Sequence, residues 1–563
     1  MSLSRNTRRL LGQHFTPEPL VRLVCSLGIR HASDRVLDPA CGDGAFLRGA
    51  VERLASLGAS AHDGQIAGFE IDPAHAATAA GIRGVHVTAA DFFSQTPSPC
   101  FDSIVGNFPF VRQEFLVEQR NRIAGIVCGE WAFEFPAVLR LSGRADLYLY
   151  FFLHALRFLR EGGRMAVISG NSWLHAPYGG VLRELFLEKL RLDMVLESRS
   201  DVWFAHTTAN AVITVLQKTS PSQSVAFVQL PALPAAACPA TDDPLPRGSQ
   251  VRQVPAAALR AEQNWSCRLR APGVYFSILE LAGERLTEMS NAARIARGIT
   301  TGLNRFFIIE REKALGLGIE QEFLRPVVAS LKNVKSLVLR PEHAGHCLVC
   351  VNRPRERLRG TRVLAYIEEF ERSGALPAHS PSLAGRGDWF RLALKPPADL
   401  VIIRFRRERH FSPANPHGLL VSDTVFTAAM RNRSDVPLCI AAANGTLFHF
   451  FAEVAGRDNM GGGFITTYGP ELRTLLLPAM DCVRPHENEL TTAFAALAAR
   501  DIDTMQKELR RADRRSLDEI IWKALRLPGP LLDEMYSAFD GILERRKHHG
   551  QMARSRLAGK PPT

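Results

Sequence analysis

The chain has few cysteines for its length, ten among 563 residues, and they are scattered without a dense framework. This usage fits a reducing compartment better than a secreted disulfide scaffold. No stretch reaches the ~20 apolar residues of a membrane span, and the N-terminus MSLSRNTRRLL lacks the apolar region of a signal peptide. We therefore expect a cytoplasmic protein with no membrane partner.

Metal ligands in a recognisable pattern are also scarce. Cys347 and Cys350, with His343 and His346 just upstream, have a spacing that zinc can use, but no second ligand pair follows nearby. The segment CLVCVN alternates small and apolar residues in the manner of a strand. The sequence favours a buried strand here, and we predict no metal site.

Negative charge is in deficit, because 57 Asp and Glu face 69 Lys and Arg, which gives a net charge of +12. Such a balance suits a polyanionic partner, although a merely basic soluble enzyme is the competing interpretation. The length exceeds one ordinary hydrophobic core and indicates two or three domains. We predict three segments, with residues 1–245, 246–480 and 481–563.

Seven short apolar runs between residues 35 and 217 predict strands, with helical patterns or loops between them. Because the runs are apolar on both faces, we expect an α/β, Rossmann-like, seven-stranded and mostly parallel sheet covered by helices. The helix within DLYLYFFLHALRFLREGG is expected to end at Gly162 and Gly163. The seven runs are RVLD, IAGFEI, VHVTA, FDSIVGN, RMAVIS, LDMVLES and NAVITVLQ.

The rest of the chain has a different texture. After about residue 218, clusters of Pro, Ala and Ser predict loops or a linker instead of another βα unit. Residues 246–480 are irregular and rich in arginine, which indicates a mixed α+β domain. Residues 481–563 have helical periodicity, with Ser516 and Glu519 as an expected capping box, and they end in a basic tail.

A glycine-containing turn follows the first predicted strand in RVLDPACGDGAFL. Gly42 and Gly44 would let a ligand approach the backbone at the carboxyl end of that strand. A dinucleotide fingerprint would need a third glycine where this chain has Leu47, which argues against NAD.

Acidic residues end the next two predicted strands. Glu70 is placed to accept hydrogen bonds from ribose hydroxyls, and Asp91, followed by two phenylalanines, suits the edge and face of an adenine ring. Each acid taken alone is more often a helix cap. Their order along three successive strands is the stronger indication, and it predicts a nucleoside-shaped site.

In this order the turn and the two acids resemble the site of class I S-adenosylmethionine-dependent methyltransferases. GQHFTPEPLV before the first strand and GNFPFVR after the fourth narrow the resemblance to type II restriction-modification N6-adenine-specific DNA methyltransferases of the gamma motif order. In that family the cofactor motifs come first and a target recognition domain comes last. Segments from about residue 12 to 480 agree, among them RADLYLYFF, LREGGRMAVISGNSWL, GITTGLNRFFI and GRDNMGGGFITTYGPELRTLLLP.

The resemblance implies S-adenosyl-L-methionine as the cofactor and assigns residues to each of its parts. A threonine would meet the methionine end, an acid would bind the ribose, and Ile71 would pack on the adenine, which an acid and a phenylalanine would hold at its edge and face. The implied cofactor-binding residues are Thr16, Asp38, Ala40, Gly42, Glu70, Ile71, Asp91, Phe92 and Asn107.

The resemblance also implies a catalytic loop of Asn107, Phe108, Pro109 and Phe110. If the Asn107 side-chain oxygen and the Phe108 main-chain carbonyl each accept one N6 proton of adenine, the lone pair of the amine is freed for attack. Phe110 would stack on a base rotated out of the duplex, and Phe204 would pack against it from another side, unless it is an ordinary core aromatic.

One member of the loop departs from the family, which normally has proline where this chain has Phe108. The main-chain acceptor is retained, but a restricted φ angle is lost. Pro109 still favours an extended conformation at the residue before it. The departure puts the rigidity of the loop in question.

We expect double-stranded DNA as the substrate. Arg and Lys of RFRRERHF, residues 404–411, and of LKNVKSLVLR are candidates for phosphate contacts, with a solvated basic face as the alternative. The implied partner is a cognate restriction endonuclease encoded separately and forming no stable complex, and motifs that begin by residue 12 disfavour a fused nuclease. Two other functions stay open: methyl transfer to RNA or protein, and a DNA-binding module whose catalytic loop has decayed.

Overall fold

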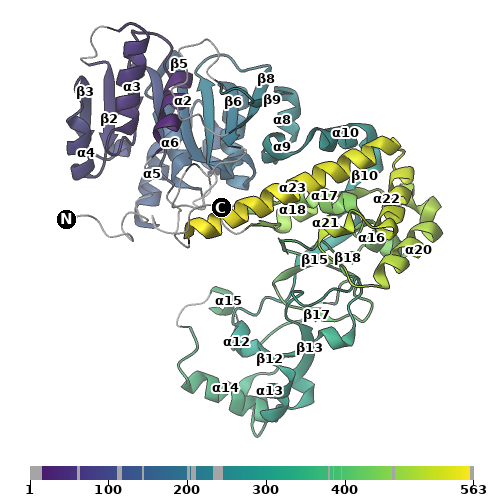
Figure 1. Ribbon diagram of the computed structural model, residues 1–563. Coiled ribbons are helices and arrows are strands. Elements are labelled where there is room, and N and C mark those ends of the chain that lie inside the picture. Colours follow the sequence, from purple (N-terminus) through teal and green to yellow (C-terminus); the bar gives the residue numbers. More distant parts are fainter. Residues whose placement is uncertain are drawn as a thin grey trace. The chain divides into compact units, whose positions relative to one another are not determined.

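The computed structural model describes residues 16–59, 64–110, 117–141, 145–198, 203, 211–231, 245–377, 381–384, 386–394, 396–459 and 463–557. It divides into two compact units (Figure 1). The first unit is Met1–Ala271 with Ala553–Thr563, and the second is Pro272–Met552.

The first unit contains a sheet whose nine strands have the order β3-β2-β1-β4-β5-β7-β6-β8-β9. All neighbouring strands are parallel except that β7 is antiparallel to β5 and β6, and β9 is antiparallel to β8. The order reverses at β1, which pairs with β2 on one side and β4 on the other. The strands are β1 Val36–Asp38, β2 Ile66–Glu70, β3 Val85–Ala89, β4 Phe101–Asn107, β5 Leu159–Gly170, β6 Arg191–Ser198, β7 Ala211–Gln217, β8 Ser224–Leu230 and β9 Gln250–Pro255.

Helices cover both faces of this sheet. Successive strand residues point to opposite sides, so each face presents apolar side chains to its own helices. Val36 and Val105 pack with the helices of one face, whereas their neighbours Leu37 and Ile104 pack with those of the other. The first face carries α2 Glu18–Gly28, α3 Ala45–Ser56 and α4 Pro73–Ala80, and the second carries α5 Val117–Trp131, α6 Leu147–Leu156 and α7 Gly180–Glu188. Two short helices, α8 Ala256–Ala261 and α9 Ser266–Arg270, follow β9.

All seven predicted strands are present, as β1 to β7. The sheet also contains two strands that the sequence did not predict. β8 and β9 extend the sheet through a segment that was expected to be loop or linker. The boundary expected at residue 245 precedes β9, and the structure divides the chain after Ala271 instead. The helix expected to reach Gly162 ends at Leu156. Gly162, with a φ angle of 76°, already belongs to β5, close to a register shift in the pairing of β5 with β4.

The second unit is of mixed α+β type, with four small sheets instead of one large one. Its strands fall into sheets ordered β10-β21, β11-β18-β15, β12-β14-β13-β17 and β16-β20-β19. They are β10 Leu286–Glu288, β11 Ala293–Arg297, β12 Ile308–Glu310, β13 Leu324–Val328, β14 His346–Val349, β15 Leu400–Ile403, β16 Phe405–Arg406, β17 Leu420–Val421, β18 Val425–Met430, β19 Arg457–Asn459, β20 Phe464–Thr466 and β21 Leu476–Pro478. Cys347 lies buried in β14, which confirms the strand interpretation of CLVCVN.

The helices of the second unit include those that were expected to form a separate C-terminal segment. α20 and α22 pack on each other and on helices that precede residue 480. The helices are α10 Gly273–Ala282, α11 Met289–Ala292, α12 Asn304–Phe307, α13 Arg311–Gly316, α14 Arg362–Arg372, α15 Pro381–Ala384, α16 Val436–Ala442, α17 Thr446–Ala455, α18 Gly469–Arg473, α19 Met480–Val483, α20 Glu487–Ala498, α21 Met505–Glu508, α22 Ala512–Ala524 and α23 Gly529–Leu557.

The capping box expected at Ser516 and Glu519 is wrong. Helix α22 begins at Ala512, and within it the Ser516 hydroxyl donates to the Ala512 carbonyl while Glu519 pairs with Arg515. The serine therefore lies one turn inside the helix, where its hydroxyl bonds back to the preceding turn.

The long helix α23 is tied to the second unit by a buried arginine, Arg546. Its guanidinium donates to the main-chain carbonyls of Arg406, at 3.0 Å, and Arg407, and it lies 2.9 Å from Glu453 Oε1. Glu453 in turn accepts from His410 Nε2 at 2.9 Å if that nitrogen carries the proton. A buried carboxylate with two basic partners satisfies the demand that buried charges be paired.

Arg406 corrects one expectation for the basic segment at residues 404–411. Its side chain is fully buried, where desolvation lowers its pKa to about 10, and it donates to Thr467. It is therefore neither a phosphate contact nor part of a solvated face.

Within the described residues, no single helix is long and apolar enough to cross a membrane. One bent pair passes a test of length and composition alone: Arg433–Ala442 with Thr446–Ala455, which meet at 76°.

Candidate functional site

The carboxyl ends of β1, β2 and β4 meet at the point where the strand order reverses. Open α/β sheets bind ligands in the crevice outside such a point. Asp38, Glu70 and Asn107 are the last residues of these three strands. The structure therefore brings together three of the polar residues that the sequence singled out.

Glu70 ties the first two strand ends to each other. Its Oε2 accepts from the main-chain N–H of Gly42 at 2.9 Å, and its Oε1 accepts from that of Asp72 at 2.8 Å. Gly42 adopts a φ angle of 54°, in the left-handed region that favours glycine. The glycine turn after β1 is thus held against the end of β2.

Asp38 is buried and only partly satisfied. Its Oδ1 accepts from the Ala40 N–H at 3.1 Å, whereas its Oδ2 is buried with no hydrogen-bond partner among the described residues. Burial, with a smaller contribution from the charge of Glu70, raises the pKa of Asp38 from 3.8 to about 8. An unsatisfied buried carboxyl oxygen at a strand end is unfavourable unless a ligand supplies the missing partner.

Asn107 shows the same feature at the end of β4. Its Nδ2 donates to the Thr16 hydroxyl at 3.2 Å, which leaves its Oδ1 buried without a partner in the described part of the chain. The side chain is therefore oriented by Thr16, and its acceptor oxygen is unused.

Gly106 brings the ends of β1 and β4 into close approach. A Cβ atom at this position would lie 2.7 Å from Asp38 Oδ1, so only glycine fits without displacing that carboxyl. Asp38 thus occupies the space beside Gly106.

Phe108 is anchored by both its main chain and its ring. Its N–H donates to the Ile168 carbonyl at 2.9 Å, which continues the pairing of β4 with β5 by one residue. The fully buried ring packs 5.6 Å from Phe151 and 5.0 Å from Phe152. Contacts unavailable to a proline therefore hold the loop, which answers the question of its rigidity.

Phe110 and Tyr148 flank Gly170, the last residue of β5. A Cβ atom at Gly170 would lie 3.7 Å from the Phe110 ring and 3.1 Å from the Tyr148 ring. Phe110 and Pro109 are half-buried. The other expected stacking residue, Phe204, lies outside the described residues.

After β3, Asp91 and Phe92 both have partners within the protein. Asp91 Oδ1 caps the short turn that follows β3 by accepting from the Phe93 N–H at 3.1 Å, and its Oδ2 pairs with Arg122 of α5. The ring of Phe92 is 3% exposed and packs against Phe158 and other aromatic side chains, so its face is covered by protein. The expected contact of this ring face with an adenine is therefore not available.

Ile71, unlike Phe92, is open to solvent. It follows β2 directly and is 58% exposed, one of the few large apolar side chains in the described residues that lie open to solvent. An apolar ligand face packed on it would remove that surface from water.

Residues 2–236 match the family model described as N-6 DNA Methylase, and residues 277–516 match the model for the C-terminal domain of the type II methyltransferase M.Eco57I. The first half of the chain thus resembles N-6 DNA methylases, and the second half resembles the C-terminal domain of a type II methyltransferase. A match to an N-6 DNA methylase implies S-adenosylmethionine as the cofactor, and the curated relatives are type II methyltransferases.

Two curated relatives illustrate the similarity. M.AccI from Acinetobacter calcoaceticus is 23% identical over 348 residues, which covers 60% of each chain. M.TthHB8I from Thermus thermophilus is 32% identical over 197 residues, which covers 35% of this chain and 41% of that protein. The matches span less than two thirds of these relatives.

One solved structure is similar over nearly the whole chain. The type IIL restriction-modification enzyme MmeI, in complex with DNA, aligns with a TM-score of 0.63 and 13% identity, covering 98% of this chain and 80% of that one. At such identity the match shows a shared fold. It supports the arrangement of an α/β unit followed by a second domain.

The first unit has a hydrogen-bonded cluster beside the candidate loop, residues 107–110, that sequence reasoning missed. Asp146 Oδ2 accepts from the hydroxyls of Ser172, at 2.9 Å, and Tyr178, at 2.7 Å, while the Tyr148 hydroxyl accepts from the Trp173 N–H at 3.0 Å. The segments RADLYLYFF and GNSWL were recognised as family segments, but no role was assigned to a residue in them. The spacing of Asp146, Tyr148 and Tyr178 along the chain follows no pattern from which their contact could be predicted.

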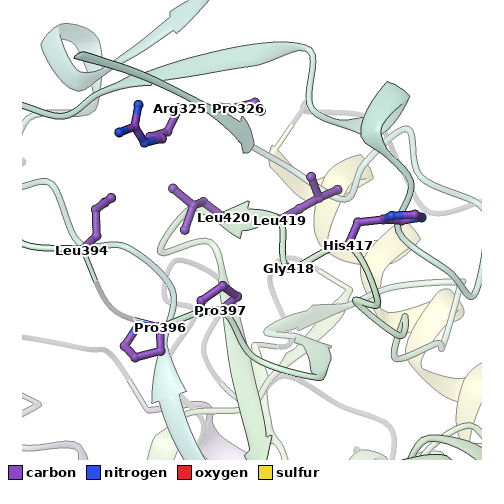
Figure 2. A pocket seen from close by; sticks show the side chains of 9 residues that line it. All are labelled: Arg325, Pro326, Leu394, Pro396, Pro397, His417, Gly418, Leu419 and Leu420. Atoms are coloured by element: carbon purple, nitrogen blue, oxygen red, sulfur yellow. The ribbon is translucent and has the colours of Figure 1, made fainter. Parts of the chain in front are cut away.

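A pocket in the second unit offers no comparable chemistry (Figure 2). Among its described lining residues, only Arg325 and His417 carry ionisable side chains, and prolines, leucines and a glycine form the rest. Arg325 donates to the main-chain carbonyls of Glu322 and Leu324. The strand ends of the first unit thus remain the candidate functional site.

Proposed function

We propose that this chain is a site-specific DNA methyltransferase that transfers a methyl group from S-adenosylmethionine to N6 of an adenine in duplex DNA. The observation that supports this best is the unpartnered Oδ1 of Asn107, buried at the end of β4 in the position of the family's catalytic asparagine. An acceptor held there without a partner suits the N–H of an incoming exocyclic amine.

The residues at the strand ends fit the cofactor. Asp38 Oδ2 is a buried acceptor that lacks a donor, Ile71 is an exposed apolar surface, and Glu70 holds the turn that contains Gly42. We propose that Thr16, Asp38, Ala40 and Gly42 surround the methionine part, Glu70 the ribose, and Ile71 and Asp91 the adenine. When bound, S-adenosylmethionine supplies the electrophilic methyl group.

The catalytic loop acts on the target amine by hydrogen bonding. The lone pair of adenine N6 is delocalised into the ring, and two acceptors on its protons, Asn107 Oδ1 and the Phe108 carbonyl, draw the nitrogen toward a tetrahedral shape. Thr16 holds the Asn107 carboxamide so that its oxygen and not its nitrogen faces the base. Preorganisation of this kind lowers the barrier because little reorientation is left for the reaction itself.

Target adenine has to leave the duplex to reach this loop, at a cost of a few kcal/mol in unstacking. We propose that Phe110 offsets this cost by stacking on the extruded base, with Phe204 as a second wall. The half-buried Phe110 ring, held beside Gly170 and Tyr148, gives a stacking surface with little freedom to lose.

Glu70→Ala is expected to weaken cofactor binding about 10- to 100-fold, the effect of losing hydrogen bonds to a charged group. The carboxylate holds two main-chain N–H groups, so its removal frees the glycine turn as well as the ribose site. Calorimetric titration with S-adenosylhomocysteine checks the affinity. Glu52→Ala, which removes a mostly exposed carboxylate of α3, is the matched control. Unchanged affinity in Glu70→Ala would remove Glu70 from the cofactor site.

Cofactor affinity is expected to rise with pH up to about 8, through Asp38. Its raised pKa keeps the carboxyl largely protonated at neutral pH in the free protein, and a cationic ligand favours the carboxylate, so binding releases a proton. By the same linkage, the free protein is stabilised by this group at low pH and loses that stabilisation as pH rises from 3.8 to about 8.

Titration in buffers of different ionisation enthalpy measures the proton release. Asp38→Asn is expected to bind S-adenosylmethionine more weakly and with no proton release in this pH range. The same release from Asp38→Asn and wild type would assign the proton to another group.

The modified atom and the recognised sequence come from one experiment. We expect single-molecule sequencing of DNA from a methylation-free host that expresses this chain to show N6-methyladenine at one short sequence. Methyl groups on RNA or protein and none on DNA would favour the alternative substrates, and none anywhere would favour the decayed binding module. We also propose that a separate endonuclease cuts the same sequence when it is unmethylated.

A further inference from the structure

The sheet β16-β20-β19 of the second unit presents aromatic and cationic side chains on one face. Phe405 is paired with Thr466, and Thr466 with Arg457, so these three residues share a side of the sheet. Arg406 and Ile465 pair with each other on the opposite side, and both are buried. The register therefore turns Phe405 outward, where it is 47% exposed.

Six side chains form a connected row of rings and guanidinium groups, here termed the Phe405 ladder. The Arg457 and Arg404 guanidinium carbons lie 4.7 and 4.8 Å from the Tyr468 ring centre, and Arg404 also lies 4.7 Å from Phe405. Phe405 meets Phe464 edge to face at 5.8 Å, and Arg407 lies 5.4 Å from Phe464. Each such contact holds the side chains in place.

Two of these cations have no acidic counterpart in the described residues. Arg457 pairs with Glu471, but neither Arg404 nor Arg407 forms an ion pair with a carboxylate there, and Arg404 Nε is buried without an acceptor. Some arginines stacked on rings elsewhere in this unit are neutralised, such as Arg353, which lies over Phe323 and pairs with Glu322. The ladder thus combines open aromatic surface with uncompensated positive charge.

We infer that the Phe405 ladder is a contact surface for duplex DNA. This inference rests on the proposed function, which makes DNA the substrate. Arg404 and Arg407 supply charges for two phosphates, and Phe405 supplies an apolar face for a sugar or an unstacked base edge. An acidic protein surface would satisfy the arginines but gives no reason for the exposed Phe405 ring beside Arg404, whereas nucleic acid alternates anions with flat apolar groups.

The two kinds of side chain predict different defects. Neutralising both arginines removes two phosphate contacts, so the slope of log affinity against log salt is expected to fall by about 2. Removing the ring of Phe405 leaves the charges in place, so that slope is expected to stay constant while the affinity falls about 10-fold or more. A surface that only adds diffuse positive charge would show the first effect without the second.

Binding of the full-length protein to fluorescently labelled mixed-sequence duplex DNA, measured by anisotropy over a range of salt concentrations, tests the inference. The variants are Arg404→Gln with Arg407→Gln, and Phe405→Ala. The controls are Arg353→Gln, an exposed arginine that lies over a ring but is paired, and Phe133→Ala, a phenylalanine that is 97% exposed in the first unit. Thermal unfolding checks that each variant is folded.

Wild-type affinity and salt slope in both ladder variants would overturn the inference, and so would losses equal to those of the controls. Tighter binding of a matched duplex RNA by the wild type, lost in the ladder variants, would assign the surface to RNA instead. Failure of this binding test can be distinguished from failure of the proposed methylation. Asn107→Ala is expected to bind DNA normally and to methylate it about 10³-fold more slowly, whereas ladder variants that methylate and bind as wild type would overturn only the present inference.

Discussion

Asn107→Ala is expected to reduce the rate of methyl transfer by about 10³-fold, within the range for a positioned group in proton handling or charge stabilisation. The substitution removes the one side-chain acceptor at the end of β4 that is buried without a partner in the described part of the chain. Cofactor affinity is expected to change little, because Asp38, Glu70 and Ile71 are untouched. Single-turnover incorporation of labelled methyl groups into DNA measures the rate.

A matched variant separates acceptor loss from simple disruption. Asn107→Asp keeps an acceptor oxygen but loses the Nδ2 donor to Thr16, so it is expected to retain more activity than the alanine variant. Wild-type rates in Asn107→Ala would reject the proposed role of the loop. Equal losses in both variants would instead indicate that orientation by Thr16, and not the acceptor itself, limits the rate.

Phe108→Ala is expected to lower the local unfolding free energy of the first unit by about 3–5 kcal/mol, the usual cost of deleting a buried phenylalanine ring. The ring is fully buried between Phe151 and Phe152. Hydrogen exchange of the β4 and β5 amides measures this energy in the whole protein. Phe133→Ala, which deletes a ring that is 97% exposed, is expected to change stability by no more than about 0.5 kcal/mol.

The variant Phe108→Pro introduces the residue that the family usually has at this position, but we do not expect it to stabilise the loop. It deletes the ring and also the N–H that donates to the Ile168 carbonyl. We therefore expect it to be at least as unstable as the alanine variant. Wild-type stability in Phe108→Pro would mean that neither anchor matters and that the loop is held elsewhere.

The strands and their polar ends were predictable because their signals are local. Runs apolar on both faces located β1 to β7, and an acid after a strand located Glu70 and Asp91. β8 was missed because SVAFVQL, itself a plausible strand, lies between proline- and serine-rich stretches that dominated the interpretation. β9 pairs with it along an exposed edge and has weak apolar character, so the boundary near residue 245 was placed too early.

What could not be predicted depends on contacts between distant residues. Asp38 and Gly106 approach each other only because β1 and β4 are neighbours in the sheet. The burial of Arg406 follows from a two-residue strand whose register turns it inward, and no periodicity can be read from two residues. The covered face of Phe92 results from packing against Phe158 and His154, which lie more than 60 positions away.

The hydrogen bonds from Arg546 to the main chain of Arg406 and Arg407 have a consequence for shortened forms of the protein. The strand that bears Phe405 is supported from beneath by a residue close to the C-terminal end of the described chain. A shortened protein that ends before Arg546 would leave the buried Glu453 without one of its two basic partners, while every side chain of the Phe405 ladder is still present. Trimming this terminus for expression or fusion would thus imitate the loss of a binding residue.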